Sequence, residues 1–171
     1  HTIESVDRMH NETFDNLITL GFIGATLWLA LFAAAFYFSI KLLGLSVRGG
    51  WKNPFIPFST VGVVAGILLP LAAGHSYLIG VGVIAGLLAG VIAFVAWSAC
   101  RNPHVNFTGD GRQVFVFCIL GALIAHFVES GVGITVTTTR AYSFVLLAIL
   151  CGLAVKNIYS IEEPAKLRAP K

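Results

Sequence analysis

A histidine–asparagine pair and two glycines stand at a defined spacing near the start of this sequence. His10 and Asn11 are followed by nine residues and then by Gly21 and Gly24, which lie three residues apart. An imidazole exchanges protons near neutral pH and often serves as an acid–base group. The amide of Asn11 can orient that ring or cap the start of a helix. His10 is therefore the first candidate for chemistry.

Four more ionisable residues interrupt the apolar sequence: His75, His126, Glu129 and Arg140. Ionisable groups are costly to place in a membrane, so those within apolar stretches favour a functional role. A structural role competes with it, because His126 and Glu129 fall three residues apart and can contact each other across one helical turn. His75 can equally be an interfacial turn residue, and an isolated histidine can ligate haem or a pigment.

The amino-acid composition indicates whether these residues belong to a soluble or a membrane protein. Hydrophobic residues make up 57% of the 171 residues and charged residues 11%, against about 45–50% and about 25% in soluble domains. A soluble chain of this length cannot bury so much apolar surface, whereas lipid accepts it. The net charge of +3 is too small and too dispersed to indicate nucleic-acid binding. No metal-ligand spacing occurs, and Cys100, Cys118 and Cys151 are interpreted as small apolar residues.

The apolar runs predict an all-α, polytopic transmembrane bundle of about five spans, since one crossing needs about 20 apolar residues. The expected organisation is an outer segment over 1–16, a transmembrane domain over 17–155 and a cytoplasmic tail over 156–171. Turn-forming residues between Pro70 and Tyr77 divide the long uncharged run that begins at Phe55. The predicted spans cover residues 17–40, 55–73, 78–100, 114–128 and 141–155.

The basic residues predict the orientation, because cytoplasmic loops carry an excess of lysine and arginine. With five spans, the regions 41–54, 101–113 and 156–171 share one side of the membrane. That side holds nine basic residues, and the other holds only Arg8 and Arg140. The amino end is therefore expected outside and the carboxyl end in the cytoplasm. The nine are Lys41, Arg48, Lys52, Arg101, Arg112, Lys156, Lys166, Arg168 and Lys171.

Regularly spaced glycines predict close contacts between helices. Gly82, Gly86 and Gly90 recur every four residues, a spacing that lets helix backbones approach each other in lipid. Gly21 and Gly24 are expected to serve the same purpose in the first span. The glycines indicate packing and carry no chemistry of their own.

The spacing of His10, Asn11, Gly21 and Gly24 resembles the signature of the lipopolysaccharide O-antigen ligase and O-antigen polymerase family. That signature is a histidine, a small polar residue, a nine-residue spacer, a glycine, two residues and a second small residue. The later stretch from His126 to Arg140 is similar to O-antigen ligase-like bacterial proteins. The resemblance covers only the carboxyl-terminal part of the family. The preceding spans and the outer arginine loop of the family are not found in this sequence, so either they lie in another part of the protein or this chain is not expected to be competent alone.

The resemblance implies glycosyl transfer on the outer side of the bacterial inner (cytoplasmic) membrane, without a cofactor or metal. The donor would be a glycan on undecaprenyl diphosphate, and the acceptor a sugar hydroxyl on a lipid or a growing polymer. His10 would take the acceptor proton, with Asn11 orienting it. From their side of the membrane, we assign diphosphate binding to Arg8 and Arg140, because guanidinium groups match phosphate oxygens. Ligase and polymerase, and the sugar itself, are not distinguished.

A second hypothesis is a non-catalytic transmembrane subunit of a larger membrane complex, which could be associated with a pigment or haem. Such a protein would have other membrane subunits as stable partners. It would also tolerate replacement of His10, which a glycosyltransferase using His10 as its base would not.

Overall fold

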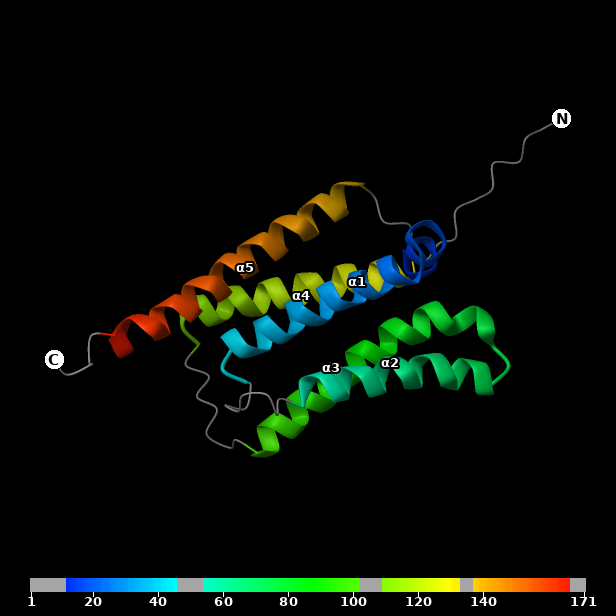
Figure 1. Cartoon of the computed structure of the whole chain (residues 1–171), viewed down its shortest axis with the longest axis horizontal. Coiled ribbons are helices and arrows are strands. Elements are labelled where there is room, and N and C mark those ends of the chain that lie inside the picture. The colour runs from blue at the N-terminus through cyan, green and yellow to red at the C-terminus, as the bar shows by residue number, and fades with distance from the viewer. Residues whose placement is uncertain (1–11, 46–53, 102–108, 133–136, 167–171) are drawn as a thin grey trace.

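The computed structural model describes residues 12–45, 54–101, 109–132 and 137–166. Within these residues the regular structure is entirely helical (Figure 1). A short 3-10 helix, η1, lies between the second and third of five α-helices. The elements are α1 (Glu12–Leu42), α2 (Phe55–Ala72), η1 (Ser76–Leu78), α3 (Ile79–Arg101), α4 (Gly111–Val132) and α5 (Thr137–Lys166).

Five of the described helices are long and apolar enough to cross a membrane, which confirms the predicted all-α, five-span fold class. Large apolar side chains also cover the outside of the bundle, among them Phe22, Ile56 and Leu69, each more than two-thirds exposed. Such a surface is unsuited to water but matches hydrocarbon. The chain is therefore a multi-pass membrane protein.

The fourth and fifth helices are longer than their apolar cores. The predicted spans 114–128 and 141–155 lie inside the helices α4 and α5. At the start of α4, Asp110 Oδ1 accepts a hydrogen bond from the Gln113 amide at 2.7 Å, and Gln113 Oε1 accepts one from the Gly109 amide at 3.0 Å. This reciprocal cap stabilises the polar first turn. The 22 residues of α4 reach about 33 Å, enough to cross the hydrocarbon core.

Successive helices run in opposite directions, so their ends gather at two ends of the bundle (Figure 1). We call these the His75 end, where α1 and α5 begin and α2 joins α3, and the Lys41 end, where α1 and α3 finish. Among residues with described side chains, the basic residues of the Lys41 end are Lys41, Arg101, Arg112 and Lys156, all exposed. Arg140 lies at the His75 end, near the start of α5. The orientation of these ends in a membrane stays a prediction.

Helices α2 and α3 form a hairpin with direct backbone contact. A Cβ atom at Gly62 would meet the backbone of Gly86, and one at Gly66 would meet that of Gly82. Gly90 lies in the same way against the backbone at Phe58. The predicted glycine series of the third span thus faces α2, where small residues let the two helices approach closely.

The other three long helices, α1, α4 and α5, lie side by side on one face of this hairpin (Figure 1). Large side chains fill their junction: Phe32 and Phe36 of α1 surround the fully buried Phe127 of α4, with ring centroids 4.7 and 5.6 Å away. Helix α3 joins the two groups, since Ile84 packs against Gly131 of α4. Bulky rings hold α1 and α4 apart, unlike the glycines of the hairpin.

Candidate functional site

A cavity of about 260 Å³ opens between α1, α4 and α5 at the His75 end. We call it the Arg140 cavity. Most of its wall is apolar and aromatic, and three side chains from α4 and α5 add polar atoms. Its lining residues are Leu20, Trp28, Leu31, Phe32, His126, Arg140, Ser143, Phe144 and Leu147.

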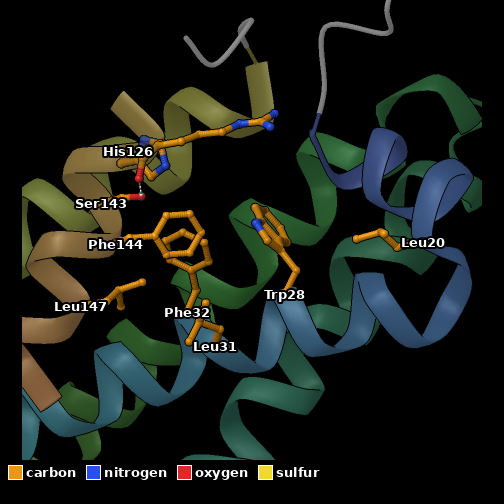
Figure 2. Close-up of a pocket in the computed structure, with 9 residues that line it drawn as sticks. Leu20, Trp28, Leu31, Phe32, His126, Ser143, Phe144 and Leu147 are labelled. Atoms are coloured by element: carbon orange, nitrogen blue, oxygen red, sulfur yellow. Dashed lines mark hydrogen bonds between the residues drawn. The ribbon is translucent and has the colours of Figure 1, made fainter. Parts of the chain in front are cut away.

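The polar groups of the Arg140 cavity share one side of it. Arg140, Ser143 and Leu147 recur at three- and four-residue intervals, so they lie on one face of α5. The Ser143 hydroxyl donates a 2.7 Å hydrogen bond to the Arg140 carbonyl oxygen. Figure 2 shows Trp28 between Leu20 on one side and His126 and Ser143 on the other. The cavity thus combines an aromatic wall with a cationic group and an imidazole.

His126 lies close to Glu129, as the sequence allowed. The distance from His126 Nδ1 to Glu129 Oε2 is 3.7 Å, and the two side chains are 11% and 44% exposed. This distance is longer than a hydrogen bond and corresponds to an ion pair when the imidazole is protonated. The ring of His126 also packs near Phe32, with centroids 6.2 Å apart. The contact leaves His126 within the cavity wall.

An apolar groove lies next to the Arg140 cavity, between α1 and α5. Leu31 and Leu147 line both spaces. The groove has a volume of about 170 Å³ and runs toward Cys151 and Val155. Together the two spaces have a cationic opening at the His75 end and an apolar stretch that runs toward the Lys41 end, where Val155 directly precedes Lys156. We call the second space the apolar groove; its remaining lining residues are Ala34, Ala35, Phe38, Leu150 and Ala154.

A break in α1 brings Leu20 to the cavity. Gly21 has φ 69° and ψ −173° inside the helix, a conformation essentially restricted to glycine. No described atom lies within 4 Å of a Cβ added at Gly21, whereas one added at Gly24 would meet the side chain of Leu20. The expected helix-packing role is therefore not seen at Gly21. Gly21 turns the chain, and Gly24 leaves room for the Leu20 side chain.

The predicted site residues fall into three groups. Arg8, His10 and Asn11 lie outside the described residues, so their roles stay predictions from the sequence. Arg140 lines the cavity. His75 is exposed in the α2–α3 turn, where its Nδ1 lies 3.4 Å from the Tyr77 hydroxyl.

Sequence reasoning missed the aromatic wall of the cavity. Trp28, Phe32 and Phe36 recur every four residues along α1, a signal that marks one face of a helix. Trp28 and Phe32 line the cavity, whereas Phe36 is fully buried beyond it. The four-residue spacing could have identified this aromatic face of α1, but not the helices that pack against it.

The described residues contain no group of three or more histidine, cysteine, aspartate or glutamate side chains that could hold a metal ion. Comparison with known proteins adds no family assignment: no family model, no curated protein and no solved structure matches this chain.

Proposed function

We propose that this chain is part of an O-antigen ligase- or polymerase-like glycosyltransferase of the bacterial cytoplasmic membrane. It would move a glycan from undecaprenyl diphosphate to a sugar hydroxyl on the outer side. One observation carries the proposal: the Arg140 cavity and the apolar groove are neighbours that share Leu31 and Leu147 as lining residues. A path that is cationic at one end and apolar along its length suits a lipid with an anionic head.

The head of such a lipid would lie in the Arg140 cavity. A guanidinium group offers several donors in a planar fork that fits phosphate oxygens. The His126 ring adds a hydrogen-bonding nitrogen to the same lining, whereas the single O–H of Ser143 is donated to the Arg140 carbonyl oxygen. The diphosphate that leaves during glycosyl transfer carries the growing negative charge, so a cation at this position would lower the barrier.

The chain of the lipid would follow the apolar groove. Along α5 the distance from Arg140 to Val155 is about 22 Å at the rise of an α-helix. The groove offers no charged lining residue in that interval. Its walls are leucine, alanine, phenylalanine, valine and cysteine side chains, which suit an isoprenoid chain.

The His10–Asn11 pair supports the transfer step in this proposal. It directly precedes α1 in the sequence, and α1 begins at Glu12 at the His75 end. The acceptor oxygen would attack the anomeric carbon while the bond to the diphosphate breaks. His10 would take the acceptor proton, and Arg8 and Arg140 would stabilise the departing diphosphate.

A binding experiment tests the lipid site separately from catalysis. Trp28 lines the cavity, so a variant with Trp51→Phe and Trp97→Phe makes its fluorescence a local reporter. In nanodiscs we expect a saturable change on adding undecaprenyl diphosphate. Arg140→Gln should weaken this binding about tenfold, which corresponds to about 1.4 kcal/mol. Undecaprenol, which lacks the diphosphate, should bind equally to both forms. Equal affinity of both forms for undecaprenyl diphosphate would contradict the proposed head-group site.

A second experiment tests the catalytic role. His10→Ala in the complete protein should abolish glycan transfer and leave membrane insertion unchanged. Retained transfer would rule out His10 as the base. Normal glycan display with stable co-purification of other membrane proteins would favour the non-catalytic subunit instead.

A further inference from the structure

A second cavity lies on the other side of His126, between α4 and α5. Its volume is about 320 Å³, and its polar lining comes from Glu129, Thr139 and Tyr142. His126 and Ser143 line this cavity as well as the Arg140 cavity. These two residues therefore face both spaces, which lie at the same end of the bundle. We call the second space the Glu129 cavity.

The two cavities differ in the charge that they present. Arg140 lines only the first, and Glu129 lines only the second. A carboxylate repels phosphate and other anions, so the Glu129 cavity is unsuited to a second lipid phosphate. It is suited to a neutral ligand that offers hydroxyl donors, because an ionised carboxylate accepts hydrogen bonds only.

Beside Glu129, the Glu129 cavity is lined by an aromatic ring, hydroxyl groups and the apolar side chains of Ala122, Ala125 and Leu146. Tyr142 is 67% exposed, and its ring can cover the apolar face of a pyranose while its hydroxyl bonds a neighbouring group. Thr139 and Ser143 contribute hydroxyl groups to the same lining. A few polar groups around an aromatic surface are what a small neutral ligand requires for orientation.

We propose that the Glu129 cavity is the subsite for the neutral acceptor sugar. His126, which lines both cavities, positions an acceptor hydroxyl toward the donor in the Arg140 cavity. This assignment rests on the proposed glycosyltransferase function and deepens it: donor and acceptor approach His126 from opposite sides. The charge difference between the cavities keeps the anionic donor out of the acceptor subsite.

Saturation-transfer difference NMR on the chain in nanodiscs tests the assignment. The probes are methyl glucoside, methyl galactoside and the methyl glycoside of N-acetylglucosamine, with glucose 6-phosphate as the anionic comparison. We expect at least one neutral glycoside to bind. Glucose 6-phosphate should bind at least about fivefold more weakly than that glycoside. Tyr142→Ala and Glu129→Gln should each weaken glycoside binding about fivefold or more. Tyr77→Ala should have no effect, because this tyrosine is equally exposed at the same end but lies in η1, outside the cavity.

The Trp28 response to undecaprenyl diphosphate serves as the control for folding. It should be unchanged in Tyr142→Ala and Glu129→Gln. Three results would overturn the acceptor subsite: no neutral glycoside binds, glycoside binding survives both substitutions, or the substitutions abolish lipid binding together with sugar binding. If Arg140→Gln did not weaken the binding of undecaprenyl diphosphate while glycosides still bound, the result would instead count against the proposed donor site.

Discussion

The helices of the α2–α3 hairpin and those of the α1–α4–α5 group pack against each other in opposite ways. In the hairpin, glycines bring two backbones together, so that a single added Cβ at Gly86 would strike the Gly62 backbone. In the three-helix group, the rings of Trp28, Phe32 and Phe127 pack in edge and tilted arrangements at centroid distances of 4.7 to 5.4 Å and hold the helices apart. Cavities lie between the second set of helices, where Arg140 and His126 are found.

This difference distinguishes the helices that stabilise the fold from the helices that enclose the cavities. Close backbone contact in lipid gains dispersion energy over a long interface and leaves no room for a ligand. Large side chains cannot fill every gap near the helix ends, and the gaps that remain can take a ligand. We infer that the hairpin is the rigid part of the fold and that ligand binding belongs to α1, α4 and α5.

The largest expected effect comes from adding volume to the hairpin. Gly86→Val would place a branched side chain against the Gly62 backbone, which cannot move without separating the helices. We expect the free energy of unfolding to fall by about 3 kcal/mol or more, measured by reversible unfolding in mixed micelles.

The matched control is Gly121→Val. Gly121 is exposed on α4, and a Cβ added there would have no described atom within 4 Å. Its replacement should change the free energy of unfolding by less than about 1 kcal/mol. If Gly86→Val and Gly121→Val lowered the free energy of unfolding by similar amounts, the hairpin would not be more closely packed than the three-helix group.

An intermediate effect is expected at the break in α1. Gly21→Ala forces a side chain into a conformation reserved for glycine and should cost about 1–3 kcal/mol. The strain can be relieved by straightening α1, which would withdraw Leu20 from the Arg140 cavity. The Trp28 emission spectrum should therefore shift together with the loss of stability. An unchanged spectrum and unchanged stability would show that the break is not required.

The smallest effect on stability is expected from adding volume to the open region. Ala34 is exposed and lines the apolar groove, so Ala34→Leu should change the free energy of unfolding by no more than about 0.5 kcal/mol. The same substitution should weaken the binding of undecaprenyl diphosphate, because it occupies the lipid path. A large loss of stability would mean that the groove is closely packed after all.

Much of the fold could be predicted from the sequence. Long apolar runs separated by turn residues predicted five spans, and the break near Gly74 appears where the run from Phe55 is divided. Gly74 has φ 76° there, and the His75 amide donates to the Pro70 carbonyl oxygen at 2.8 Å. The ends of α4 were less predictable, because hydropathy does not register a side-chain cap such as that of Asp110.

The candidate site could be predicted only in fragments. Arg140 was identified because a charge near an apolar run is conspicuous, and His126 with Glu129 because their spacing matches a helical turn. Leu20 gave no such signal, and the four-residue series that contains Trp28 marks a helix face without identifying its partner helices. Both residues belong to a helix far from α5 in the sequence, and only the packing of α1 against α4 and α5 brings them to the same cavity.

The sequence by itself determined that the chain is helical, crosses a membrane about five times and carries its basic residues in alternate loops. These properties depend on local hydropathy and charge, which lipid and water sort without reference to the rest of the fold. The tertiary structure decided which helix faces meet, that α1 breaks at Gly21, and that His126 lines two cavities. Lipid and neighbouring helices are both apolar, so hydropathy cannot distinguish a lipid-facing side from a helix-facing one. Only the shapes of the packed side chains make that distinction.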